Sequence, residues 1–175
     1  DPANTPTPQY VGLASAFRLA TLNLRWDTQL AQGVGLRLDG DYIRNLAYDK
    51  QAMSNRANNG IVDNYGAGGT ASIDTFRSGD TAWMVQATFG ATELKEKGQW
   101  QALLGYKHIE ADALPDAYND PNFHLGGTNA KGYFIGANYG LDKNIYASAR
   151  WLSASEVYGA PFEVDVMQLE LNTRF

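Results

Sequence analysis

Apolar and polar residues alternate along most of the chain. Near the C-terminus, Met167, Leu169, Leu171, Thr173 and Phe175 share one parity, and Gln168, Glu170, Asn172 and Arg174 share the other. Successive side chains of a strand point to opposite faces, so this pattern predicts a strand with one apolar and one polar face. Seven segments predict such strands: residues 20–26, 34–42, 83–89, 100–107, 133–141, 145–151 and 167–175.

The connections between these segments alternate in length. Short connections lie at about 27–33, 92–99 and 142–144, and long polar loops lie at about 49–79, 110–129 and 154–162. Tight turns at one end and long loops at the other predict an all-β, antiparallel, up-and-down sheet. We expect no stable helix between Asp49 and Asp80, because that segment is rich in Gly, Asn and Asp. A hairpin hidden in this loop would add two strands.

The aromatic residues are sorted toward the ends of the apolar faces. Trp83 and Phe89, Trp100 and Tyr106, and Tyr133 and Tyr139 are each six residues apart, and Ile145 and Trp151 repeat the spacing. In antiparallel strands, one belt (Trp83, Tyr106, Tyr133, Trp151) falls at the long-loop end and another (Trp26, Phe89, Trp100, Tyr139, Phe175) at the short-turn end. Two belts around an apolar band are typical of a transmembrane β-barrel, whose apolar face meets lipid.

The height of this band tests the membrane interpretation. Six residues of tilted strand rise about 15 Å, whereas the apolar band of a barrel is about 25 Å tall. The belts must therefore be broad, or form the inner of two rows. The alternative, in which the aromatics form the core of a soluble sandwich, does not require them to sort by strand end.

Charged residues recur on the polar faces of the predicted strands. The candidate lumen-lining set is Arg25, Arg37, Asp39, Asp41, Lys107, Arg150, Glu170 and Arg174. In a wide barrel these side chains would select solutes by charge, and in a narrow barrel of about eight strands they would pair and plug the interior. They could also simply satisfy one another in a wet lumen.

Composition narrows the function classes. The 175 residues, 44% hydrophobic and 19% charged, suffice for one domain, which we place at 1–175. The absence of cysteine excludes disulfides and thiol catalysis. A net charge of -5 without a basic cluster makes nucleic acid an unsuitable partner. No apolar stretch approaches the roughly 18 residues of a membrane-spanning helix, and we expect any signal peptide to have been removed.

Candidate chemistry is sparse. His108 and His124 are the only histidines, and neither accompanies a catalytic partner, so we expect no enzyme and no cofactor. Asp112, Asp116, Asp120 and His124 repeat every fourth residue, but Pro115 and Pro121 interrupt the helix that would align them on a metal. We therefore interpret this segment as a solvated acidic loop.

Several stretches resemble a known family. They are residues 104–107 (LGYK), 116–120 (DAYND), 123–133 (FHLGGTNAKGY), 138–141 (NYGL), 150–154 (RWLSA) and 169–175 (LELNTRF). The chain is similar to the putative porin family of Gram-negative outer membranes, closely from about Gln101 to Phe175 and loosely before that segment. The resemblance implies the C-terminal part of a larger barrel. The terminal Phe175 also resembles the C-terminal signature that the barrel-insertion machinery recognises.

Together these features predict an outer-membrane porin, a passive diffusion channel for small hydrophilic solutes. We expect the long loops outside the cell and the C-terminus on the periplasmic side. The alternative is a small closed barrel of about eight strands with a plugged interior and a structural, anchoring or recognition role. The number of predicted strands is odd, and Pro2, Pro6 and Pro8 argue against an eighth strand at the N-terminus. We therefore expect the first and last strands to pair with strands outside this chain. Expected partners are outer-membrane lipid, the insertion machinery, strands of the same longer polypeptide or another chain, and solutes.

Overall fold

A computed structural model describes residues 13–56, 61–62, 70–71 and 76–174. Its strands are β1 (Leu19–Ala31), β2 (Val34–Asn45), β3 (Ile61–Val62), β4 (Thr70–Ala71), β5 (Thr81–Gly90), β6 (Trp100–Ile109), β7 (Ala130–Asp142), β8 (Ile145–Glu156) and β9 (Glu163–Thr173). The helical elements are α1 (Lys50–Arg56) and the 3-10 turn η2 (Asp116–Tyr118). In the described part of the chain, no helix is long and apolar enough to cross a membrane.

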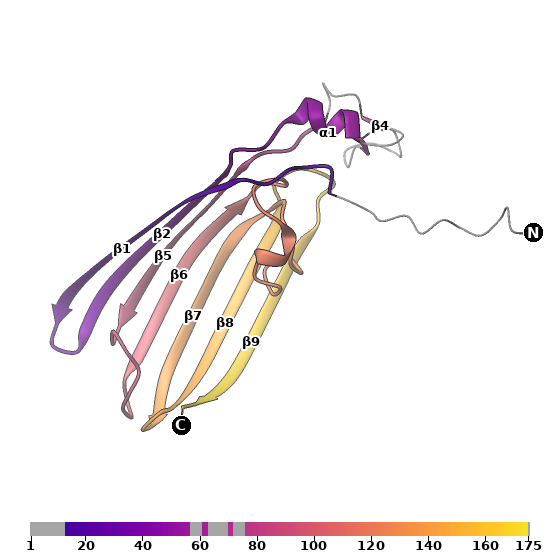
Figure 1. Cartoon of the computed structure of the whole chain (residues 1–175). Coiled ribbons are helices and arrows are strands. Elements are labelled where there is room, and N and C mark those ends of the chain that lie inside the picture. The colour runs from indigo at the N-terminus through magenta and orange to yellow at the C-terminus, as the bar shows by residue number, and fades with distance from the viewer. Residues whose placement is uncertain (1–12, 57–60, 63–69, 72–75, 175) are drawn as a thin grey trace, which may run out of the picture.

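Seven strands form one curved sheet in the order β1-β2-β5-β6-β7-β8-β9 (Figure 1). Each strand pairs antiparallel with the next, which confirms the predicted all-β, up-and-down class. The strands are 10 to 13 residues long. This length matches the roughly 9–11 residues that a tilted strand needs to cross a bilayer.

The sheet is not closed in this chain. Strands β1 and β9 are its two edges and do not pair with each other in the described residues. Strands β3 and β4 form a separate two-stranded sheet, so the hairpin between residues 49 and 79 adds nothing to the main sheet. The small barrel closed by β1 and β9 is therefore not formed by this chain.

Two connections differ from the sequence expectations. Strands β1 and β2 extend to a two-residue turn, Gln32 and Gly33, in place of a connection over 27–33, and Gly33 adopts φ 76° there. The predicted loop 154–162 shortens to 157–162, because β8 continues to Glu156. Alternation of side chains does not mark where pairing ends, so the boundaries moved outward.

The expectation of no helix between Asp49 and Asp80 is wrong. Helix α1 begins directly after Asp49, whose carboxylate accepts a hydrogen bond from the backbone N–H of Ala52 at 2.9 Å. The side chain of Met53 is buried and anchors the helix. Residues 50–56 contain no Gly, so the average composition of the longer segment concealed a capped, anchored turn.

The register separates the side chains onto two faces. The face that we call the aromatic face carries Trp26, Trp83, Tyr106, Tyr133 and Trp151. The opposite face, which we call the loop-covered face, carries Arg25, Arg37, Asp39, Lys107 and Arg150. On the aromatic face, Trp83 stacks on Tyr106 with ring centroids 5.5 Å apart, and Tyr133 meets Trp151 edge to face at 5.5 Å. The short-turn end carries exposed Trp26, Phe89, Trp100 and Tyr139. Phe175 lies outside the described residues.

The aromatic row at the long-loop end runs diagonally across the register. Trp83 lies opposite His108, Tyr106 lies opposite Tyr133, and Tyr133 lies opposite Ser153. The row Trp83, Tyr106, Tyr133, Trp151 therefore shifts by four residues over three strand-to-strand steps. With about 3.3 Å per residue and about 4.8 Å between strands, a level row requires a strand tilt of about 40°. Transmembrane barrels have tilts of about 35–45°.

Substitutions on the aromatic face test its contact with lipid. Ile135→Arg and Ala149→Arg should each lower the free energy of unfolding from a bilayer by about 2–4 kcal/mol, because each places a charge in the apolar band. Reversible denaturant titration of the protein in lipid vesicles measures this loss. The control Thr88→Arg, on the loop-covered face, should lose much less. Equal losses at all three positions would contradict the assignment of the faces.

Candidate pore lining

The loop between β6 and β7 (residues 110–129) folds back over the sheet. Figure 1 shows it, in orange, lying across the strands instead of extending beyond their upper ends. Ala113, Leu114 and Phe123 of this loop are buried and form a core cluster with Phe134 and Leu152 of the sheet. The principal buried core of the described residues thus lies between this loop and one face of the sheet.

Acidic side chains shape the loop from within. The carboxylate of Asp116 accepts hydrogen bonds from the backbone N–H of Thr128 at 3.1 Å and from its hydroxyl at 2.9 Å. The carboxylate of Asp120 accepts a hydrogen bond from the backbone N–H of Asn122 at 3.0 Å. Such side chain to backbone bonds are how aspartate stabilises turns. They hold Phe123 over the sheet.

Asp120 also meets two basic residues of the sheet. Its carboxylate lies 3.7 Å from Nζ of Lys107 on β6 and 3.6 Å from a guanidinium nitrogen of Arg150 on β8. The ammonium of Lys107 lies 5.1 Å from the ring centroid of Phe123 and 5.3 Å from that of Phe134, within reach of a cation–π attraction. The loop therefore brings one negative charge against two positive charges of the loop-covered face.

The interpretation of residues 112–124 as a solvated acidic loop needs correction. Burial raises the pKa of the Asp112 carboxyl, which accepts a hydrogen bond from the Ser78 hydroxyl. Burial also acts to raise the pKa of Asp120, but the Asn122 hydrogen bonds and the charges of Lys107 and Arg150 outweigh it and hold that pKa below its ordinary value. The loop is partly buried because its apolar residues pack against the sheet and are thereby removed from water.

Gly105 on β6 allows the closest packing of this cluster. A Cβ atom at Gly105 would overlap the tip of the Phe134 ring, so the ring lies directly over the glycine. Phe134 is 2% exposed, although the alternation placed it on the polar parity. The absent side chain on β6 therefore makes room for an aromatic ring within a face that is otherwise largely polar.

The four predicted charges on β1 and β2 all have partners across the strands: three are in ion pairs, and the fourth, Asp41, is hydrogen-bonded to a neutral amide. Arg25 lies opposite Asp39, with Nε and the carboxylate 2.6 Å apart, and Arg37 lies opposite Asp27 at 2.7 Å. The carboxylate of Asp41 accepts a hydrogen bond from the Asn23 amide. These pairs follow directly from register, since opposite residues in an antiparallel pair lie close together.

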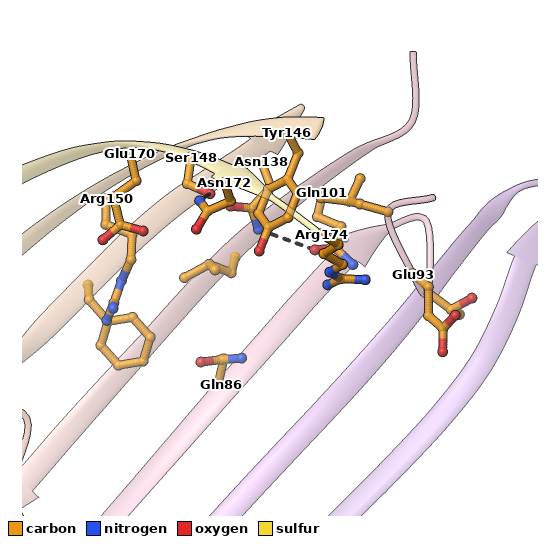
Figure 2. Close-up of a pocket in the computed structure, with 14 residues that line it drawn as sticks. Gln86, Glu93, Gln101, Asn138, Tyr146, Ser148, Arg150, Glu170, Asn172 and Arg174 are labelled. Atoms are coloured by element: carbon orange, nitrogen blue, oxygen red, sulfur yellow. Dashed lines mark hydrogen bonds between the residues drawn. The ribbon is translucent and has the colours of Figure 1, made fainter. Parts of the chain in front are cut away.

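The other two predicted charges, Glu170 and Arg174, lie toward the short-turn end of the same face. They line a groove of about 560 Å³ together with Arg150 and with polar residues of β5 to β9 (Figure 2). The eight predicted lining residues thus divide into three groups. Four lie on β1 and β2 with partners across the strands, Lys107 and Arg150 both contact Asp120 of the loop, and Glu170 and Arg174 line the groove.

Sequence reasoning missed Asp120, Phe123 and Phe134 as parts of this site. Leu114 and Phe123 were the available signal, because large apolar residues in a polar loop predict that the loop packs against something. No sequence pattern indicated that Asp120 would contact Lys107 and Arg150, because these two residues lie on different strands and are not sequence neighbours of Asp120.

The histidines have structural environments. The His108 ring stacks on Trp83 with centroids 5.8 Å apart, and the His124 ring lies 3.7 Å from the Glu156 carboxylate and edge to face with Phe162. Within the described ranges, no group of three His, Asp or Glu residues is arranged to hold a metal ion.

These features define a class of protein: an antiparallel, up-and-down sheet with one aromatic face and one polar, loop-covered face, as in porins. A comparison with family models supports this class, since the model described as putative porin matches residues 1–175. The chain therefore belongs to the putative porin family, over its whole length and not only over its C-terminal part. Family membership implies the bacterial outer membrane. No curated protein and no solved structure matches the chain.

Phe123 should hold the loop against the sheet. Phe123→Ala removes a buried aromatic side chain, a change that typically costs about 3–5 kcal/mol. We expect faster amide hydrogen exchange throughout residues 110–129, with little change in the strands. The control Tyr118→Ala removes a side chain that is 74% exposed and should leave the exchange unaltered. Equal acceleration by both variants would contradict this role.

The low pKa of Asp120 predicts that acid loosens the loop. A carboxyl whose pKa is lower in the folded than in the unfolded state stabilises the fold above the unfolded value of about 3.9. That stabilisation is lost as the pH falls from there through the folded pKa. Hydrogen exchange of the loop should therefore accelerate below about pH 4, relative to the strands.

Two variants separate Asp120 from the other carboxyls. Asp120→Asn should weaken the loop at neutral pH and diminish its further loosening in acid. Asp112→Asn should leave the acid response intact, because burial shifts the pKa of Asp112 in the opposite direction. An acid response unchanged in Asp120→Asn would count against the assignment to this residue.

Proposed function

We propose that the protein is a passive, non-enzymatic diffusion channel for small hydrophilic solutes in the bacterial outer membrane. The observation that carries this proposal is the folded loop, which places Asp120 against Lys107 and Arg150 on a largely polar face. Charges held on the wall of a narrowed passage create a local electric field, and such a field sorts solutes by charge and dipole.

The plugged-barrel alternative has less support. The buried cluster under the loop covers only part of the sheet, and the groove of about 560 Å³ lies on the same face beyond it. This open space supports a wet interior better than one filled by paired charges. The ion pairs of β1 and β2 are compatible with a wet wall, because Arg25 retains 61% of its side-chain exposure.

The orientation and the partners belong to this proposal. We place the long loops outside the cell and the C-terminus at the periplasmic side, where the insertion machinery would recognise the last strand. Lipid would cover the aromatic face. Strands outside this chain, from the same polypeptide or another copy, would pair with the edges of β1 and β9, since unpaired backbone groups in hydrocarbon cost several kcal/mol each.

Conduction by charge variants tests the channel. Replacing Arg25, Arg37 and Arg150 together by Gln leaves Asp27, Asp39 and Asp120 without these cations, so the wall becomes more negative. In a planar bilayer with a salt gradient, the reversal potential should shift toward cation selectivity. The control replaces Arg44 and Lys131 by Gln; the register positions of these two residues belong to the aromatic face. This control should shift the reversal potential less than the triple variant. No conductance from the intact protein, or an unchanged reversal potential in the triple variant, would contradict the proposal.

A further inference from the structure

The groove on the loop-covered face has a distinct chemical character. It lies between the Asp120 cluster and the short turns, and side chains of β5, β6, β7, β8 and β9 line it. Figure 2 shows amide and hydroxyl groups gathered along it, with Asn138, Ser148 and Asn172 close to one another. Its volume of about 560 Å³ falls in the range of small-molecule sites.

Hydrogen bonds fix the amides of this groove in place. The side-chain amide of Gln101 donates to the backbone oxygen of Ala91 at 2.7 Å. The side-chain amide of Asn138 donates to the side-chain oxygen Oε1 of Gln101 at 3.2 Å. On the neighbouring strands, the Asn172 amide donates to the Ser148 hydroxyl at 3.3 Å. Each carboxamide has two donor hydrogens and a two-lone-pair oxygen, so these bonds leave donors and acceptors side by side for a ligand.

The charges of the groove balance. Its lining holds two arginines, Arg150 and Arg174, and two glutamates, Glu93 and Glu170, so its formal charge is zero. Within the described part of the chain, Arg150 meets Asp120, Glu93 meets Lys95, and the Arg174 guanidinium lies 5.4 Å from the Tyr146 ring centroid. The lining as a whole therefore favours neither sign of ion, and Arg150 and Glu93 are already engaged in ion pairs.

We propose that this groove binds neutral, hydroxyl-rich solutes, namely small sugars. Sugar hydroxyls both donate and accept, and neighbouring amide and hydroxyl groups match them without requiring a net charge. Leu103, which also lines the groove and is half-buried, offers apolar surface for the C–H face of a sugar ring. The inference rests on the proposed channel function and names the solute class that the channel favours.

Current blockade in planar bilayers tests the site with maltose as the probe. Maltose should reduce the ion current of the intact protein in a saturable manner. Triglycine, a zwitterion, and maltobionate, the carboxylate derivative of maltose, should block less at equal concentration. Normal conductance without saturable blockade by maltose, or stronger blockade by either charged probe, would overturn the sugar site alone. Absence of conductance would overturn the channel and the sugar site together.

Matched variants assign the blockade to the groove. Gln101→Met with Asn138→Leu keeps side-chain size but removes the amides, and should raise the half-blocking concentration of maltose by about tenfold or more. Asn172→Leu is a milder change on the edge strand and should raise the half-blocking concentration several-fold. This variant replaces the double variant in the test if the double variant forms no channels. Asn23→Leu, on the same face outside the groove, should leave it unchanged. Unchanged blockade in the groove variants would overturn the assignment.

Discussion

Backbone hydrogen bonding within the ladder is the constraint on which the rest of the structure depends. A strand in hydrocarbon must satisfy its N–H and C=O groups through its neighbours, because no water is available there. Consecutive antiparallel pairing achieves this between neighbouring strands from β1 to β9 and leaves only the outer edges of β1 and β9 open in the described residues. Once the ladder is set, the two-residue period assigns every side chain to the aromatic face or to the loop-covered face, and the positions of the aromatic rows and of the charges follow from the register.

The loop of residues 110–129 adds a second layer to this ladder. Its attachment combines apolar burial at Phe123 with the electrostatic contact of Asp120, and both act at the same place on the sheet. Asp120 also forms part of the turn that presents Phe123. One side chain therefore contributes to the fold of the loop and to the charge pattern of the proposed passage, so the two properties are coupled.

Much of the fold could be predicted because strand periodicity is a local signal. The alternation identified all seven strands of the main sheet, and the loop of residues 110–129 has the predicted bounds. Helix α1 escaped prediction because its stability depends on the Asp49 cap and on burial of Met53, which composition does not report. Strand ends were also misplaced, since alternation gives the face of a residue but not the extent of pairing.

The candidate site was less predictable because it depends on tertiary contacts. The sequence assigned Lys107 and Arg150 to the polar parity, and the structure places them there. The pairing of Arg25 with Asp39 required the register of β1 and β2, which the turn length decides. The contact of Asp120 with both basic residues required the path of a long loop, and no periodic pattern encodes such a path.

Gly105 would give the proposed passage a steric control that is separate from its charges. The Phe134 ring rests over this glycine, and Lys107 and Arg150 lie near the same ring. A single methyl group at Gly105 would overlap the tip of this buried ring and would force the ring, with the loop residues packed in the same cluster, away from the sheet. The bore would then narrow while the formal charges of the wall stayed the same. In the proposed channel, permeability to bulky solutes and preference for charge would thus vary independently, through different positions on β6.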